Sequence, residues 1–144
     1  MNPRNTGRLL KIASNQMVRD LDKFADQFDL TSTQMAIIDY LVNNENKEIL
    51  QKDLEKEFSI QRSTATVLLQ RMEKKELVYR KASKKDARQK SIHLSEHAHK
   101  LSTKVSKYME LQQKQLEKRF SKETIDLFEE ILHFYIKKEN EYEG

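Results

Sequence analysis

The sequence predicts a mainly α-helical single domain with one small β-hairpin. Apolar residues recur at steps of three and four along most of the 144 residues, and this spacing is typical of amphipathic helices. Two short segments, residues 78–80 and 91–94, instead alternate with a period of two, as strands do. Only two Gly and one Pro are present, so long loops without secondary structure are not expected.

The first helix is expected over residues 8–29. Its apolar positions follow helical steps and predict one buried stripe: Leu10, Ala13, Met17, Leu21, Phe24 and Phe28. Thr31 and Gln34 then have the spacing of a capping box, which starts a second helix. That helix is expected to run to the Asn-rich stretch 43–46, and a shorter helix is expected around residues 51–57.

The next helix, expected at about residues 61–75, has two different sides. One side is apolar and is expected to face the core: Ala65, Leu68, Leu69 and Met72. The opposite side carries small polar, amide and basic side chains, which can reach base edges and phosphates in a DNA groove. A helix that is merely solvated would more often show Glu and Lys pairs four residues apart.

A hairpin is expected at about residues 78–94, with the basic segment ASKKDARQK between its strands. Together with the helices before it, this hairpin predicts a winged helix-turn-helix over residues 31–94. Residues 60–94 hold ten basic and three acidic residues, a net charge of +7, whereas the remaining 17 basic and 20 acidic residues give −3. A basic region on a slightly acidic body indicates a polyanionic partner, although a lysine-rich solvated surface would show the same charge pattern.

Helical spacing returns at Ser95, and two helices are expected within residues 95–144. The last of them, with Ser121 as its N-cap, is apolar on too many sides to face water in a monomer. We therefore expect a homodimer formed through the N-terminal and C-terminal helices. The side chains expected in the dimer contact are Ile125, Phe128, Ile131, Leu132 and Tyr135.

Three segments resemble the MarR family of bacterial transcriptional regulators: residues 64–80 (TATVLLQRMEKKELVYR), residues 86–88 (DAR) and residues 92–96 (IHLSE). The resemblance extends over nearly the whole chain. It implies a sequence-specific DNA-binding regulator, expected to be a repressor, that acts as a homodimer on a pseudo-palindromic operator. It also implies a small-molecule effector, whose identity the residues do not name.

The resemblance also assigns roles to residues. In the wing, Arg88 would enter the minor groove beside the recognition helix. Asp86 would orient Arg88 by a charge-assisted hydrogen bond; the alternative is that Asp86 is an ordinary turn residue. Three wing lysines would contact phosphates: Lys84, Lys85 and Lys90. Six residues of the recognition helix would face the major groove: Gln61, Arg62, Ser63, Thr64, Thr66 and Gln70.

The chain departs from the family pattern at several positions. Glu76 stands where Gly is usual, so the turn into the hairpin must form without glycine. Val67 replaces a frequent Arg, which favours apolar contact with thymine methyl groups. Ser59 and Gln61 replace the residues that are common before the recognition helix, so its N-cap is expected to be weaker or shifted.

Other classes of protein are disfavoured. The absence of Cys excludes disulfides, thiolate zinc sites, catalytic thiols and thiol-based sensing. No Ser/His/Asp arrangement or Gly-rich phosphate loop indicates an enzyme, and neither a cofactor nor a metal ion bound by the four histidines is expected. No apolar run is long enough to span a membrane, and the N-terminus lacks the apolar region of a signal peptide, so we expect a cytoplasmic protein. A winged-helix protein-interaction module and a non-specific DNA-binding protein remain as alternatives.

Overall fold

The computed structural model describes residues 2–137, and its elements are those of a mainly α fold with a small hairpin. The helices before the hairpin are α1 (Thr6–Ala25), the 3-10 turn η1 (Asp26–Phe28), α2 (Ser32–Val42), α3 (Gln51–Glu57) and α4 (Arg62–Lys74). The hairpin consists of β1 (Val78–Ala82) and β2 (Lys90–Leu94), and the helices after it are α5 (Glu96–Arg119) and α6 (Lys122–Ile136). The last residues of the expected C-terminal region, 138–144, lie outside the described part of the chain.

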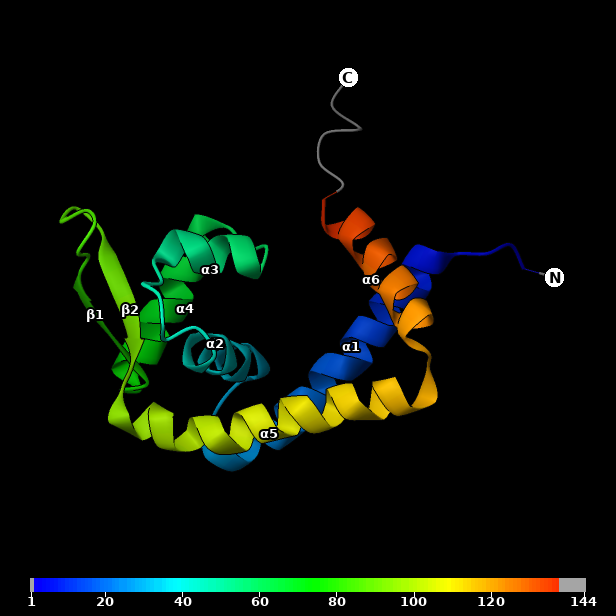
Figure 1. Ribbon diagram of the computed structural model, residues 1–144, viewed down its shortest axis with the longest axis horizontal. Helices are drawn as coiled ribbons and strands as arrows, with labels where there is room; N and C mark the ends of the chain where they lie inside the picture. The colour runs from blue at the N-terminus through cyan, green and yellow to red at the C-terminus, as the bar shows by residue number, and fades with distance from the viewer. Residues whose placement is uncertain (1, 138–144) are drawn as a thin grey trace, which may run out of the picture.

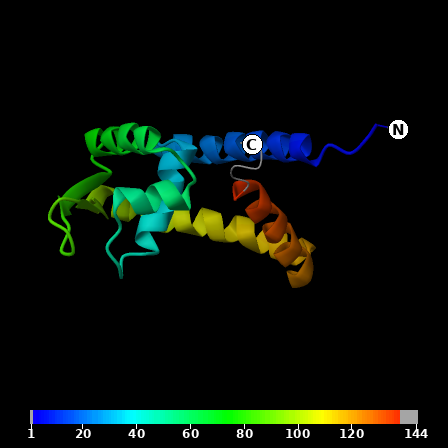
Figure 2. The same cartoon turned by 90° about the horizontal axis from the view of Figure 1, so that it is seen from above.

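Helix α5 joins the two ends of the molecule (Figure 1). At one end α2, α3, α4 and the hairpin gather into a compact unit, which we call the winged lobe (residues 31–94). At the other end α6 folds back toward the first turns of α1 (Figures 1 and 2). Helices α1 and α5 meet where Phe24 stacks on Tyr108, with ring centroids 3.9 Å apart. None of the described helices is both long and apolar enough to cross a membrane.

The hydrophobic core lies in the winged lobe and where α5 passes beneath it. Its fully buried large side chains come from most elements of the lobe and from α5: Met35, Ile37, Ile38, Leu54, Leu69, Met72, Leu77 and Val105. The burial of each such side chain stabilises the fold by about 1.5–3 kcal/mol. The expected inner side of α4 is part of this core, because Ala65, Leu69 and Met72 are buried.

Three helical segments end in the same way, at a residue other than glycine with a left-handed backbone. These residues are Asp29 (φ 57°), Ser59 (φ 49°) and Glu76 (φ 58°). After Glu76, the N–H of Leu77 donates to the carbonyl of Met72 at 2.9 Å, which is the long hydrogen bond of a Schellman motif. The turn into the hairpin therefore still needs a positive φ, and Glu76 supplies it at a cost of about 1–2 kcal/mol.

The expectation of one buried stripe along the N-terminal helix is wrong at Ala13 and Met17. Leu10, Leu21 and Phe24 are partly buried, but Ala13 is exposed and Met17 is 57% exposed. Helix α1 extends beyond the winged lobe (Figure 1), so the core of the lobe does not cover its first turns, where Gly7 instead lies near the Tyr135 side chain of α6. These residues do form a helix, as their spacing predicts, but the spacing does not identify the neighbour that covers the apolar side.

Candidate nucleic-acid interface

Helix α4 presents the predicted polar side to solvent. Gln61, Arg62, Ser63, Thr64 and Gln70 are exposed, and Thr66 is partly buried. Gln61 is the N-cap and its side chain makes no hydrogen bond to the helix start, which agrees with the weak cap expected from the sequence. The first N–H groups of α4 are therefore not satisfied by a capping side chain, and such groups can donate to a phosphate.

Thr66 is more constrained than the sequence suggested. Its hydroxyl donates to the carbonyl of Arg62 at 2.9 Å and accepts from Nε2 of Gln51, on α3, at 2.9 Å. A hydroxyl has one proton and two lone pairs, so one lone pair and the γ-methyl group are left for another molecule. Thr66 can thus accept from a base amino group or contact a thymine methyl, but it does not have its proton to offer.

Asp86 and Arg88 form the pair that the resemblance implied. Nε of Arg88 donates to Oδ1 of Asp86 at 3.1 Å, Nη2 donates to Oδ2 at 3.3 Å, and the Arg88 backbone N–H donates to Oδ1 at 3.0 Å. Hydrogen bonds from Arg88, and more weakly the charge of Lys52, hold the pKa of Asp86 below its ordinary value. The Arg88 side chain is 91% exposed. The guanidinium is thus held by the carboxylate while it faces solvent.

A concave surface of about 580 Å³ lies between α3, α4 and the hairpin, and we call it the basic groove. Five cationic side chains and one carboxylate, that of Glu55, line it together with neutral residues. The cationic side chains are Lys52, Arg62, Arg80, Arg88 and Lys90. The groove brings together four residues predicted from the sequence: Arg62, Thr66, Arg88 and Lys90.

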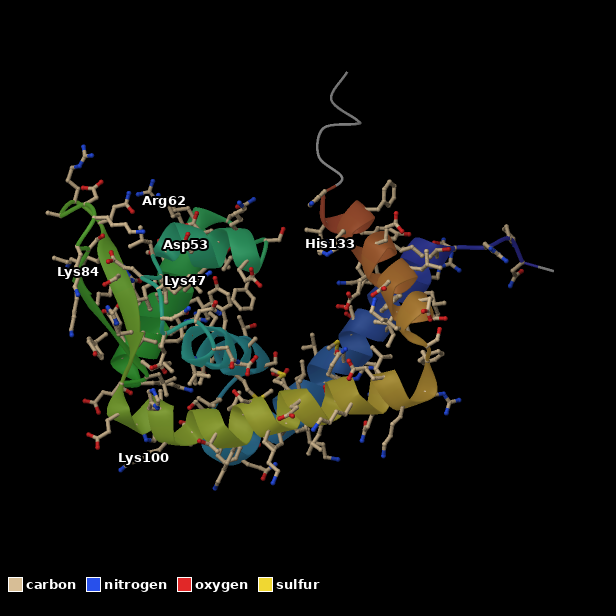
Figure 3. The ribbon with its side chains drawn as sticks, viewed as in Figure 1. Lys47, Asp53, Arg62, Lys84, Lys100 and His133 are labelled. Atoms are coloured by element: carbon tan, nitrogen blue, oxygen red, sulfur yellow. The ribbon has the colours of Figure 1, made fainter. Side chains whose placement is uncertain are left out.

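Other predicted residues lie outside the basic groove. Lys84 and Lys85 are exposed on the hairpin and do not line the groove. Figure 3 shows Lys84 and Arg62 on different elements of the winged lobe, whereas Lys100 lies on α5 beneath the lobe.

Two cationic residues that line the groove, Lys52 and Arg80, were not among the residues predicted from the sequence. Lys52 lies on a short helix with three acidic and two basic residues, so no basic pattern marked it. Arg80 pairs with Glu73 at 2.6 Å, which partly offsets its charge.

Comparison with known proteins places this geometry in a family. A family model described as "MarR family" matches residues 28–89. The crystal structure of the transcription regulator MarR from Oenococcus oeni PSU-1 is 56% identical, with a TM-score of 0.88 over 92% of this chain and 99% of that chain. This chain belongs to the MarR family.

Other solved structures of the same fold include complexes. A Staphylococcus aureus MepR–DNA complex is 25% identical, with a TM-score of 0.81 over 93% of this chain and 97% of that one. S. aureus MepR in its DNA-binding conformation is also 25% identical, with a TM-score of 0.82 over 92% and 97% of the two chains. No curated protein gives a significant match.

On this MarR-family chain, the five expected dimer residues differ in exposure. Phe128 is 47% and Ile131 is 49% exposed, and Leu132 and Tyr135 are partly buried. Ile125 is only 9% exposed, so this side chain is already buried within the protomer and needs no second copy to cover it. Further exposed apolar residues of α1, α5 and α6 were not among the expected dimer residues: Leu9, Ile12, Met17, Val18, Leu111, Phe120, Leu127, Phe134 and Ile136.

Two histidines of this MarR-family chain, His93 and His99, have ordinary partners. Nε2 of His93 lies 2.7 Å from the Ser91 hydroxyl, and the His93 ring stacks on Tyr79. Burial, with the nearby charge of Lys81, lowers the pKa of His93, and Glu48 opposes this weakly. His99 pairs with Glu45 at 2.6 Å. Within residues 2–137, no three His, Asp or Glu side chains are grouped so that they could hold a metal ion.

Proposed function

We propose that this MarR-family chain binds double-stranded DNA in a sequence-specific manner, with α4 in the major groove and the hairpin in the neighbouring minor groove. The observation that carries the proposal is the basic groove, because it joins the polar side of α4 to the wing by a concave row of cations. Cations along such a surface bind phosphates, while Ser, Thr and Gln side chains on α4 contact bases. The proposed contacts are those of the predicted residues, from Gln61 to Gln70 on α4 and from Lys84 to Lys90 on the wing.

The proposed regulator acts as a homodimer on a pseudo-palindromic operator. Support comes from the apolar side chains that α1, the end of α5 and α6 expose at one end of the molecule, among them Leu9, Leu127 and Ile131. Exposed apolar surface of this extent is typical of interfaces. Two copies related by a twofold axis would place two α4 helices in successive major grooves about 10 bp apart.

The proposed role is that of a repressor whose DNA binding a small molecule relieves. A ligand changes DNA binding only if it binds the two conformations with different affinities. A contact that could transmit such a change links the end of α4 to the junction of α1 and α2. There Nζ of Lys75 donates to the Asp29 carbonyl at 2.6 Å and to Oε1 of the buried Gln34 at 3.4 Å.

The proposal is tested by selecting bound sequences from a random double-stranded DNA library at two salt concentrations. Enrichment of an inverted repeat, bound with nanomolar-range affinity, is the expected result. Salt-sensitive binding with no enriched motif would instead indicate a non-specific DNA-binding protein. No binding at low salt would favour a winged-helix module that binds another protein.

A further inference from the structure

The turn at the tip of the hairpin is built around a buried serine. Ser83 is 6% exposed, although Ala82, Lys84 and Lys85 beside it are exposed. Its hydroxyl oxygen accepts from the backbone N–H of Lys85 at 3.1 Å and from that of Asp86 at 3.2 Å. Both lone pairs of the hydroxyl are thereby used, and its single proton remains for another acceptor.

A carboxylate from a distant segment lies at this turn. Glu48, between α2 and α3, accepts the backbone N–H of Lys84 through Oε2 at 3.3 Å. Hydrogen bonding from Ser83, then the Lys84 N–H and the charges of Lys85 and Lys84, lower the pKa of Glu48, and burial opposes them. The segment is brought here because Ile49 accepts the N–H of Ile92 at 2.8 Å, which adds it to the edge of β2.

Glu48 is an unusual choice for mere packing. Its Oε1 is buried and has no hydrogen-bond partner among the described residues. A buried carboxylate oxygen without a partner destabilises the folded state, and an apolar residue would fill the same space without that cost. The contacts of Oε2 with the turn therefore indicate a role beyond filling space.

Ser83, Asp86 and Arg88 form a continuous series of contacts. The Ser83 hydroxyl fixes the N–H of Asp86, and Asp86 in turn binds both the backbone N–H and the guanidinium of Arg88. We propose that Glu48 and Ser83 are positioning residues, which hold the turn in the one shape that lets Asp86 aim Arg88 at DNA. The inference rests on the proposed DNA-binding function for its purpose, but the contacts themselves are testable in the free protein.

The experiment compares Glu48→Gln and Ser83→Ala with two matched controls in the full-length chain. Glu45→Gln removes the same charge from the same segment, where Glu45 faces His99. Ser102→Ala removes the hydroxyl of another buried serine, one that donates to the His99 carbonyl. Hydrogen exchange measured by NMR follows the amides of Lys84, Lys85 and Asp86 and the Nε–H of Arg88.

In the free protein, Ser83→Ala is expected to speed exchange at the turn by at least about fivefold, the effect of losing one hydrogen bond. Glu48→Gln is expected to speed it less, because the remaining amide oxygen still accepts the Lys84 N–H but without the charge that strengthens this bond. Amides paired between β1 and β2 are expected to keep their wild-type protection, as are all amides in the controls. If protection falls along the whole hairpin, the two residues support the hairpin in general and the proposal is overturned. Unchanged exchange at the turn overturns it as well.

DNA binding gives an independent readout. Glu48→Gln removes a negative charge beside the wing, and by charge alone this change would strengthen DNA binding. The positioning role instead predicts that DNA binding weakens by about fivefold. The preference for A·T-rich flanks is expected to fall as well. The double variant Glu48→Gln/Ser83→Ala is expected to lose no more DNA affinity than the weaker-binding single variant, because both residues act through the same turn. If wild type binds DNA and Glu48→Gln behaves like Glu45→Gln, the positioning role is refuted. If the wild-type protein binds no DNA, the proposed function fails, and the contacts of Glu48 and Ser83 with the turn are then tested by hydrogen exchange alone.

Discussion

At the scale of single residues, the orientation of one exposed arginine depends on its neighbour. An ion pair as exposed as Asp86–Arg88 contributes little to the free energy of unfolding. Its value lies elsewhere, because a guanidinium that is already aimed loses less side-chain freedom when it binds. The three hydrogen bonds from Arg88 to Asp86 supply that restraint.

Asp86→Ala is therefore expected to weaken DNA binding by about 2- to 10-fold, the cost of immobilising one more flexible side chain. The loss is expected although the substitution makes the wing more positive. Fluorescence anisotropy with the selected operator measures it. Asp20→Ala, which removes an acid from the exposed side of α1, is the charge control. Tighter binding by Asp86→Ala would show that Asp86 is an ordinary turn residue that repels DNA.

Thr66 and Arg62 are expected to differ in what they recognise. Thr66→Val keeps a methyl group but removes the hydroxyl that accepts from the Gln51 amide at 2.9 Å, which leaves that amide only its longer bond to the Arg62 carbonyl at 3.4 Å. The base preference is therefore expected to change while the salt dependence stays the same. Arg62→Ala is expected to reduce the slope of log affinity against log salt by about 0.9 if one phosphate contact is lost. Selection at two salt concentrations separates the change in base preference from the change in salt dependence. A changed salt slope for Thr66→Val would show that Thr66 contacts a phosphate instead of a base.

His93 links stability to pH. Its folded-state pKa is lowered by burial, so the folded protein binds this proton more weakly than the unfolded chain does. Stability is therefore greatest above the unfolded pKa of about 6.5 and falls as pH drops from there toward the folded pKa. His93→Gln is expected to flatten this fall in urea unfolding between pH 7.5 and 5.5. Equal slopes for wild type and His93→Gln would contradict this.

At the scale of elements, a strained residue at the end of a helix fixes the direction in which the chain leaves that helix. Glu76 has a left-handed backbone, and its carbonyl accepts the Ser95 hydroxyl at 2.6 Å, which ties the end of α4 to the start of α5. The hairpin therefore leaves α4 in a defined direction, and this places the wing beside the recognition helix.

Glu76→Gly tests that strain. Relief of about 1–2 kcal/mol is partly offset by the greater flexibility of glycine in the unfolded chain, about 0.5–1 kcal/mol, so the free energy of unfolding is expected to stay the same or rise slightly. As a comparison, Gln115→Gly, at an exposed position within α5, is expected to lower the free energy of unfolding by about 1 kcal/mol. Urea unfolding at one fixed protomer concentration compares them. Equal losses would mean that Glu76 is not strained.

At the scale of the whole molecule, the apolar residues of α1 and α6 need a partner that the protomer does not supply. Ile131→Lys is expected to give a folded monomer with weak DNA binding, because a charge would be placed in the proposed interface. Size-exclusion chromatography with light scattering measures the mass, and circular dichroism checks the fold. Asn46→Lys, on the exposed part of the winged lobe, is the control. A dimer of Ile131→Lys would remove α6 from the interface.

Local patterns in the sequence determined the elements of this protein and their faces. Thr31 and Gln34 form the capping box that their spacing predicted, Ser95 and Ser121 cap the last two helices, and α4 buries the expected side. These features depend on residues within about one helical turn of each other, where hydrogen-bond geometry and helical period leave few choices. The Asp86–Arg88 pair is equally local.

Only the tertiary structure decided which residues from different elements come into contact. It brought Lys52 into the basic groove, joined the Thr66 hydroxyl to Gln51 and set Glu48 against the turn at Lys84. It also left Met17 exposed where the helical stripe predicted burial. Each of these results depends on which distant segment folds alongside, and helical or strand periodicity names the apolar side of an element without naming the neighbour that covers it.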